Sequence, residues 1–363
     1  MKLGIIGLPS SGKTTIFNAL TKGDAPTGQS MGGRFEVLTA VVDVLDPRVA
    51  ILSDMFNPKK TTYARITYSD VAGLQKSGDE GSAVSSQLLN HLSGLDGFVH
   101  VVRAFESDLV PHPDGSVDAA RDLEALDTEF LISDLSTVEK RLFKLQEGLT
   151  KGAYKDNKAA AQAELALFEQ LNEALTEERP LRDLDLDDDQ LKSLRGYGLL
   201  TLKPTLVVIN IGDDQDEVSL PYDHRHSIVT HLRGKLEMEL AQLSAEGDEE
   251  SLEMFMAEYN VTELSLDKII RLSYDLMGLQ SFFTVGEDEV RAWTVERGAT
   301  AVEAAGVIHT DLAKGFIRAE TIHYDDLIDL GSMAQARAAG KLRQEGKTYV
   351  MQDGDIINVK FNI

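Results

Sequence analysis

The feature that most constrains this chain is a phosphate-binding signature close to its N-terminus. Residues 7–14, GLPSSGKT, match the pattern G-x-x-x-x-G-K-[ST]. They follow the apolar run KLGIIG at 2–7 and precede a helical run that begins at Thr15. A strand, a glycine-rich turn and a helix in this order form a P-loop, whose backbone N–H groups surround a phosphate. The sequence therefore predicts a nucleotide-binding α/β domain.

Each fixed position of this motif has a chemical role. The glycines let the backbone approach the β-phosphate, Lys13 reaches the β and γ oxygens, and the Thr14 hydroxyl binds Mg²⁺. We therefore predict that Lys13 acts in catalysis and that Thr14 is a metal ligand. The predicted phosphate-binding residues are Gly7, Pro9, Ser10, Ser11, Gly12, Lys13, Thr14 and Thr15.

A second motif, SDVAGL at 69–74, supports the same function. In switch NTPases an Asp-x-x-Gly at the end of a strand supplies a carboxylate for Mg²⁺ and an N–H for the γ-phosphate. This predicts Asp70 as a metal residue and Gly73 as a catalytic one. Leu74 stands where Ras-like GTPases have the glutamine that orients water, so hydrolysis here is either slow or uses another group.

Apolar runs separated by helix-length segments recur at 38–44, 64–70 and 97–103, which predicts a parallel sheet. A leucine seam then predicts a long amphipathic helix, and a second helical run at 159–175 completes an antiparallel helical hairpin. Strand patterns resume with TLVVIN and SIVTHL, so this hairpin interrupts the α/β domain. From about Phe282, short strands, turns and one helix predict a small α+β module. The seam residues are Leu131, Leu135, Val138, Leu142, Leu145 and Leu149.

Composition excludes several classes of function. The 363 residues carry a formal charge of −24, which disfavours strong unaided binding to nucleic acid or to an anionic membrane. The absence of cysteine excludes disulfides and thiolate metal sites. The N-terminal apolar run is too short for a signal peptide or a membrane span, so we expect a cytoplasmic protein. The acidic stretch 183–189 is expected to be a solvated helix entry, and DHRH at 223–226 a surface loop.

Together with these motifs, the C-terminal segments EVRAWTVERGATAVEAAGVIHTDLAKGFIRAETI and GKTYVMQDGDIINVKFNI resemble the YchF/Obg-like ATPase family. The resemblance covers nearly the whole chain. It implies a P-loop domain of the translation-factor class at 1–125 and 200–280, and an inserted helical hairpin (coiled coil) at 126–199. A TGS domain of β-grasp type would follow at 281–363. It also implies a preference for ATP over GTP, a hydrophobic residue at position 74, and association with the ribosome.

The chain departs from the family pattern at two positions near the phosphates. Ser10 stands where relatives have an asparagine that supports a potassium ion, which leaves potassium activation open. Arg34 stands where relatives have the first-switch threonine, although Thr39 keeps a hydroxyl nearby. Arg34 is either an internal positive charge that stabilises the γ-phosphate, and so catalytic, or a solvated loop residue.

The predicted base-binding residues leave ATP and GTP both open. Asn210 and Asp213 hold the outer positions of the Asn-Lys-x-Asp motif of GTPases, and Ile211 replaces its lysine. A carboxylate pairs with the two donors of guanine and repels the acceptor edge of adenine. The relatives have Asn-x-x-Glu, which goes with ATP. In LRGK at 232–235, Gly234 offers an N–H and Arg233 a cation to cover the base.

The leading interpretation is a nucleotide-controlled switch at the ribosome that hydrolyses ATP, or GTP, slowly with Mg²⁺ by water attack on the γ-phosphate. The alternatives are a GTP-specific switch, or a nucleotide-gated binding module with vestigial hydrolysis. Five basic residues of the C-terminal module are candidates for ribosome contact, with ordinary surface solvation favoured for them. They are Lys314, Arg318, Arg337, Lys341 and Arg343.

Overall fold

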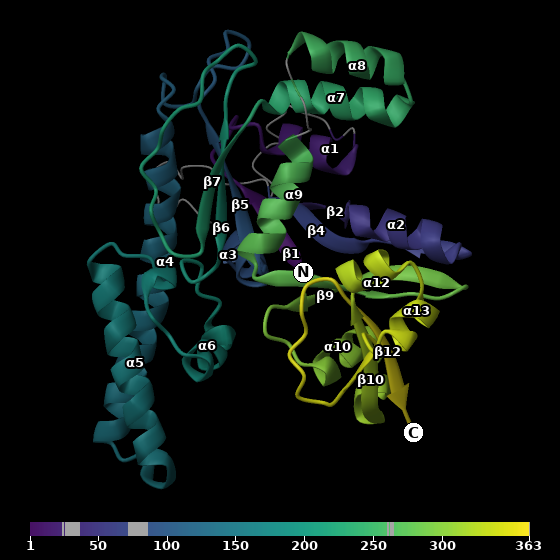
Figure 1. Ribbon diagram of the computed structural model, residues 1–363. Coiled ribbons are helices and arrows are strands. Elements are labelled where there is room, and N and C mark those ends of the chain that lie inside the picture. The colour runs from purple at the N-terminus through teal and green to yellow at the C-terminus, as the bar shows by residue number, and fades with distance from the viewer. Residues whose placement is uncertain (24, 26–36, 72–85, 260, 262–264, 363) are drawn as a thin grey trace. The chain divides into compact units, whose positions relative to one another are not determined.

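The computed structural model describes residues 1–23, 25, 37–71, 86–259, 261 and 265–362 (Figure 1). Contacts divide the chain into two compact units, one of residues 1–40 and 67–266, the other of residues 41–66 and 267–363. Strands β2 (Val37–Val44) and β4 (Ala64–Val71) each contribute residues to both units. Within the described ranges, no helix has both the length and the apolar composition needed to cross a bilayer.

A six-stranded sheet organises the first unit, with the strand order β2-β4-β1-β5-β6-β7. Strand β1 (Lys2–Ile6) is parallel to both β4 and β5, and β6 is parallel to β5 and β7. The predicted parallel sheet is therefore confirmed for these five strands. The other strands are β5 (Gly97–Arg103), β6 (Thr205–Asn210) and β7 (Ser227–Leu232). The helices are α1 (Lys13–Thr21), α3 (Ser86–Ser93), α4 (Ala119–Thr150), α5 (Lys158–Thr176), α6 (Asp188–Leu194), α7 (Gly234–Glu246), α8 (Glu249–Glu258) and α9 (Ser265–Leu276), the last running on into the second unit.

The central strands explain where the polar residues of the site gather. Every residue of β5 and β6 is buried, as expected for near-continuous apolar runs in a parallel sheet. Because parallel strands end at the same edge, the residues at their carboxyl ends come together there. This edge carries the P-loop after β1, Asp70 in β4, Arg103 at the end of β5 and Asn210 at the end of β6.

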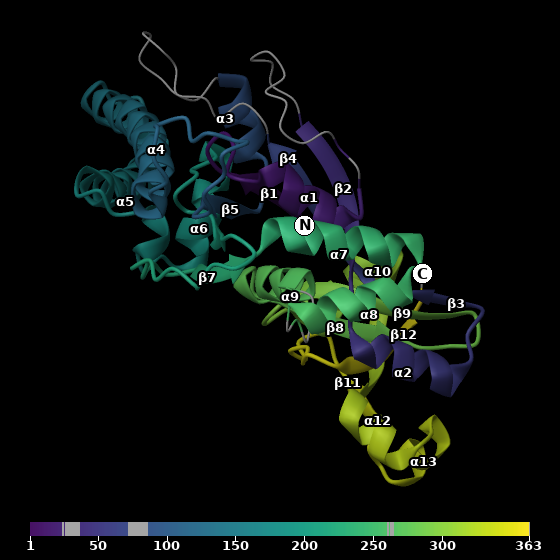
Figure 2. The ribbon, with the colours of Figure 1, turned by 90° about the horizontal axis from the view of Figure 1, so that it is seen from above.

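The two helices predicted from the leucine spacing are present as α4 and α5, which lie side by side (Figures 1 and 2). Asp118 caps α4 by accepting from the N–H of Arg121. The seam residues Val138 and Leu145 pack in one buried cluster with Phe168 and Leu171 of α5. The chain then reaches α6, where the last part of the acidic stretch forms the helix entry.

Asp187 caps α6 and forms a capping box with Gln190, and Asp188 and Asp189 occupy the first turn. Carboxylates at these positions satisfy free N–H groups and interact favourably with the helix dipole. The predicted helix entry in this acidic stretch is therefore confirmed.

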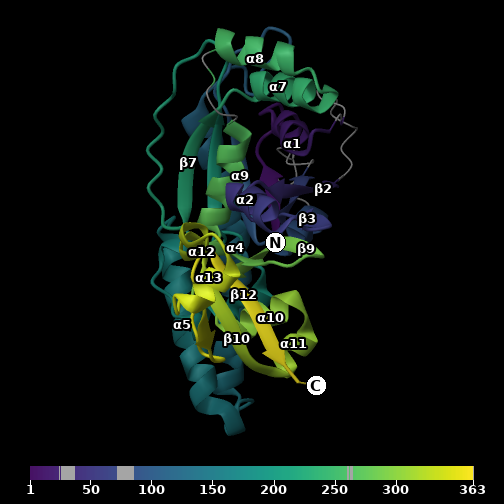
Figure 3. The same cartoon turned by 45° about the vertical axis from the view of Figure 1, so that its right-hand side comes forward.

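The second unit contains the other six-stranded sheet, with the order β11-β10-β12-β8-β9-β3 (Figure 3). Trp293 in β9 stacks on Phe282 and donates its indole N–H to Thr284, so it is a packed residue of this strand. The strands are β3 (Lys60–Thr62), β8 (Leu279–Thr284), β9 (Glu289–Glu296), β10 (Phe316–His323), β11 (Arg343–Glu345) and β12 (Asp355–Phe361). The helices are α2 (Pro47–Phe56), α10 (Ala301–Ile308), α11 (Thr310–Lys314), α12 (Tyr324–Leu330) and α13 (Met333–Ala338).

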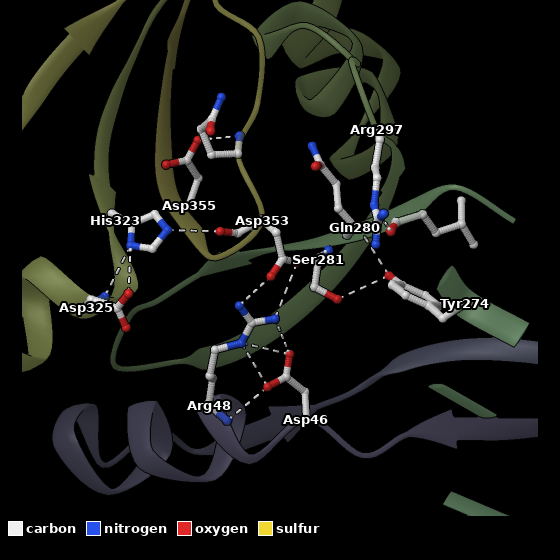
Figure 4. Close-up of polar contacts among 12 residues, drawn as sticks. Asp46, Arg48, Tyr274, Gln280, Ser281, Arg297, His323, Asp325, Asp353 and Asp355 are labelled. Atoms are coloured by element: carbon white, nitrogen blue, oxygen red, sulfur yellow. Dashed lines mark hydrogen bonds and ion pairs between the residues drawn. The ribbon is translucent and has the colours of Figure 1, made fainter. Parts of the chain in front are cut away.

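A polar cluster around Arg48 joins the two sequence segments of the second unit (Figure 4). Its guanidinium donates to Asp46 at 2.7 Å and to Asp353 at 2.7 Å, although Arg48 and Asp353 are 305 positions apart. Asp353 also accepts from the N–H of Ser281 in β8 at 2.9 Å. Asp46 is the N-cap of α2, so the cluster fixes the start of this helix to the loop that precedes β12.

Candidate nucleotide-binding site

The P-loop backbone has positive φ values at three positions, two of which are glycines. Gly7 and Gly12 have φ values of +148° and +95°, and Ser10 has φ +63°. A Cβ atom at Gly7 would lie 2.2 Å from the Val101 carbonyl oxygen, and one at Gly12 would lie 2.2 Å from the Asn210 amide nitrogen. A side chain at either glycine would therefore strain the backbone and displace a neighbour.

The ammonium group of Lys13 is folded back into its own loop, where it donates to the Leu8 carbonyl at 2.7 Å. Burial lowers the pKa of Lys13 to about 8, and the negative charge of Asp70 opposes this change. Lys13 is thus a desolvated cation at the place where the motif predicts a phosphate.

The two predicted metal residues meet directly. The hydroxyl of Thr14 donates to Asp70 Oδ2 at 2.7 Å. The other carboxylate oxygen, Oδ1, is buried and has no hydrogen-bond partner within the part of the chain that the structure describes. Burial raises the pKa of Asp70, opposed by its hydrogen bond with Thr14 and by the charge of Lys13. A hydroxyl beside a buried, partly unsatisfied carboxylate fits the oxygen ligands that Mg²⁺ prefers.

The side-chain amide of Asn210 bridges the P-loop and the start of α7 through its nitrogen and its oxygen. Its nitrogen donates to the Ser11 carbonyl at 3.0 Å, and its oxygen accepts from the Gly234 N–H at 3.0 Å. The side chain is 4% exposed, so these bonds are shielded from water. Asn210 therefore couples the P-loop to the first residue of α7.

The remaining predicted base-binding residues differ in their accessibility. Ile211 is 5% exposed and packs in a buried apolar cluster, so its side chain lies in the core. Asp213 is half-buried, and its carboxylate has no hydrogen-bond or ion-pair partner among the described residues. Arg233 occupies the N-cap position of α7, and its buried Nε is likewise unpaired there. Asp213 and Arg233 therefore keep polar groups that a base could use.

Three predicted residues of the γ-phosphate region, Arg34, Gly73 and Leu74, lie outside the described residues. The nearby Thr39 belongs to β2, where its hydroxyl is 3.4 Å from that of Ser69 in β4.

Sequence reasoning did not identify Arg103 or Phe105, which lie beside the P-loop. Arg103 is 2% exposed, donates to the carbonyls of Phe105 and Val110, and reaches the Ser10 carbonyl at 3.5 Å. Its guanidinium lies 4.4 Å from the centre of the Phe105 ring. Phe105 is within 4.0 Å of the position that a Cβ at Gly12 would occupy. The sequence signal that could have pointed to Arg103 was a charged residue at the end of a strand that is apolar enough to be buried.

Two histidines also lie next to the loop. His112 bonds Asp122 through Nε2 at 2.8 Å, and both residues line a small pocket with Leu8 and Pro9. His100 belongs to the same lining, and burial lowers its pKa to about 3, with the charges of Lys13 and Arg182 adding to the effect. His100 is therefore neutral at physiological pH.

The comparisons with known proteins agree with one another. A family model described as "50S ribosome-binding GTPase" matches residues 2–140, and the model YchF-GTPase_C, described as "Protein of unknown function", matches residues 279–362. The chain is 39% identical over 372 residues to "Ribosome-binding ATPase YchF" of Bacillus subtilis (strain 168), covering 99% of both proteins. The protein of that name from Escherichia coli O157:H7 is 39% identical over 369 residues, covering 100% of this chain and 99% of that protein. The solved structure of the Schizosaccharomyces pombe YchF GTPase matches with a TM-score of 0.84 at 34% identity, covering 99% of this chain and 97% of that chain.

Proposed function

Because the chain belongs to the YchF family, we propose that it is a Mg²⁺-dependent P-loop ATPase that binds the ribosome and changes its affinity for it with the bound nucleotide. The names of its relatives support ATP hydrolysis and ribosome binding. The observation that carries the proposal is the meeting of Lys13, Thr14 and Asp70 at the P-loop. We place this activity in the cytoplasm, with the ribosome.

In this proposal the chain's own groups prepare the phosphate site. Lys13 exchanges its bond with the Leu8 carbonyl for the β and γ oxygens of the nucleotide. Thr14 and Asp70 would hold Mg²⁺, which supplies charge neutralisation at the phosphates when bound. Asn210 keeps Ser11 and Gly234 in place while the loop is loaded.

No general base is evident in the motifs, so we propose slow intrinsic hydrolysis that the ribosome accelerates. Steady-state ATPase rates with and without ribosomes test this. The expected rate of the isolated protein is below about 1 s⁻¹, the lower end of typical enzyme turnover. A faster rate without ribosomes would contradict the need for a partner, and equal ribosome affinity with ATP analogue and ADP would contradict the switch.

The choice between ATP and GTP depends on the direction in which the carboxylate of Asp213 points. We propose ATP, following the relatives, and expect Asp213→Ala to leave binding of a nonhydrolysable ATP analogue unchanged or to tighten it. A carboxylate facing the base would instead favour guanine, since it accepts from both guanine donors. Calorimetric titration with both analogues and Mg²⁺ measures this. Tighter GTP binding that the variant loses would make Asp213 a guanine reader.

The lowered pKa of Lys13 predicts how nucleotide affinity depends on pH. Bound phosphates favour the charged ammonium, so its pKa should rise on binding. Below about pH 8 the group is already protonated, whereas above it binding must take up a proton. We therefore expect the ATP affinity to fall by up to about tenfold per pH unit above that value. Titrations in buffers of different ionisation enthalpy measure the proton uptake, and its absence at pH 9 would contradict this assignment.

A further inference from the structure

A second cavity lies in the first unit, away from the residues assigned to the nucleotide. It has a volume of about 350 Å³ and is lined by the first turns of α4 and by residues near 180, 201 and 222. This volume is at the lower end of the roughly 300 to 1,000 Å³ usual for small-molecule sites. The cavity can therefore hold a ligand of modest size.

One wall of the cavity is apolar. Leu123 and Phe130 of α4 are 5% and 4% exposed, and Leu131, Leu220 and Pro221 complete this wall. Such a surface favours an aliphatic or aromatic group over water. The ligand should therefore have an apolar part.

Another part of the lining is polar and includes Arg182, which is 5% exposed. Its guanidinium donates to Tyr222 Oη at 2.5 Å, to Ser227 Oγ at 3.1 Å and to the Thr201 carbonyl at 3.3 Å. The bond with Arg182 holds Tyr222 in position at the cavity lining, where its hydroxyl also acts on the Asp127 carboxylate.

These contacts offset only part of the cost of burying the Asp127 carboxylate. Burial raises the pKa of its carboxyl, while the charge of Arg182, the Tyr222 hydroxyl and the charge of His224 oppose this. A further cation close to the carboxylate would stabilise its ionised form.

The cavity has an excess of negative charge. Glu124 and Asp127 lie three residues apart on α4, so they share a face of the helix, and Glu178 is a third acid at the rim. Glu124 and Glu178 form no ion pair within the described ranges. The cavity also contains two basic residues, and both already have protein partners. Arg182 is bonded to three protein groups, and Nδ1 of His224 is 2.8 Å from Asp183.

Two aromatic side chains, Tyr222 and His224, also line this cavity. The rings of Tyr222 and His224 are 4.7 Å apart and nearly perpendicular, at 81°. A cation binds favourably over an aromatic face, more so where water is partly excluded. Acid, aromatic ring and apolar wall together select a positively charged group on a hydrocarbon chain.

We propose that this cavity binds an organic cation, an ammonium or guanidinium group on a short apolar chain, with its charge at Asp127 and its chain against Leu123 and Leu220. Such a group can belong to a free amine or to an arginine or lysine side chain of a protein partner. Both share this chemistry, and the experiment distinguishes them.

The test compares two ligands of the same shape and different charge, butylguanidinium and butylurea. In calorimetric titrations of the full chain at 0.15 M salt, we expect one site for butylguanidinium and at least tenfold weaker binding of butylurea. Asp127→Asn keeps the shape of the side chain and removes its charge, and should weaken butylguanidinium binding at least fivefold. Equal binding of the two ligands, or no detectable binding of butylguanidinium at 10 mM, would overturn the proposal.

Two further variants separate the cavity from the general negative charge of the protein. Glu124→Gln, an exposed change at the rim, should weaken the binding in the same direction as Asp127→Asn without affecting the fold. Glu139→Gln removes an acid from the same helix outside the cavity and should leave binding unchanged. If all three variants behaved alike, binding would be nonspecific and the site would be refuted.

The source of the cation follows from two further ligands in the same titration. An acetyl-Gly-Arg-Gly-amide peptide carries the guanidinium as a side chain, and agmatine carries it on a small free amine. Binding of the peptide as tightly as butylguanidinium supports a protein side chain, whereas binding of agmatine alone supports a free amine. Binding of either ligand that Asp127→Asn leaves unchanged would refute the cavity as its site.

Discussion

Lys13→Met is expected to lower kcat/KM for ATP hydrolysis by about a hundredfold to a thousandfold, the cost typical of removing one group that stabilises developing charge. The ammonium lies in the loop formed by residues 7–14 and is the cation predicted to reach the β and γ oxygens. Methionine keeps most of the length of the side chain and removes its charge and its hydrogen bond to the Leu8 carbonyl. Steady-state rates over a range of ATP concentrations measure the effect.

The same substitution is expected to stabilise the nucleotide-free protein. Burial lowers the pKa of Lys13 from 10.5 to about 8, so the folded state binds this proton less tightly than the unfolded chain. A lysine whose pKa is lower in the folded state than in the unfolded chain destabilises the fold at pH 7. This effect is lost as the pH rises from about 8 through the pKa of the unfolded chain. Removing this lysine should therefore raise the free energy of unfolding at pH 7, by at most about 3 kcal/mol.

Urea denaturation at pH 7 without nucleotide measures this gain. Lys192→Met on α6 is the matched control, because Lys192 has a side chain that is 63% exposed and should change neither activity nor stability appreciably. Lower activity together with higher stability would identify Lys13 as a functional residue whose charge the fold accommodates at a cost. A destabilised variant would show instead that the bond with Leu8 dominates.

Asn210→Ala is expected to destabilise the protein by about 2 to 4 kcal/mol, since each buried group that loses its partner costs about 1 to 3 kcal/mol. The substitution leaves the Ser11 carbonyl and the Gly234 N–H without the amide that joins them. Because Ser11 belongs to the P-loop, nucleotide affinity should fall as well. Urea denaturation and calorimetric titration with an ATP analogue measure the two effects.

The control for this variant is Asn172→Ala. Asn172 lies on α5, and its amide oxygen is buried without a hydrogen-bond partner within the described part of the chain. Its removal should change stability much less, because no bonded partner is left unsatisfied. Similar losses for both variants would mean that the amide of Asn210 contributes through packing alone, and that the bridge between the two loops is energetically unimportant.

Much of the fold could be predicted because the pattern is local. The run 205–210 is apolar throughout and forms the fully buried β6, and leucine spacing of three and four predicts the packed helices α4 and α5. The P-loop could be predicted for the same reason, since only a strand, a glycine-rich turn and a helix in sequence produce its geometry.

The roles of single side chains could be predicted only in part. Ile211 was expected at the base because of its place in a motif, yet its side chain packs in the core. Sequence spacing gives the order of residues in a loop but not the direction of each side chain, which neighbouring strands decide. Arg103 and Phe105 were missed because nothing local distinguishes a buried arginine at a strand end from an exposed one.

The sequence alone predicted the phosphate site, because Lys13 and Thr14 lie in one short segment whose backbone places them. Only the tertiary structure decided which distant groups act together. It brought Asp70 to Thr14 and Asn210 to Ser11, and it joined residues 41–66 to the C-terminal unit through Arg48 and Asp353. It also formed the cavity beside Asp127 from four separate segments. The physical reason is that a local conformation depends on neighbours in sequence, whereas these contacts depend on packing between elements far apart in the chain.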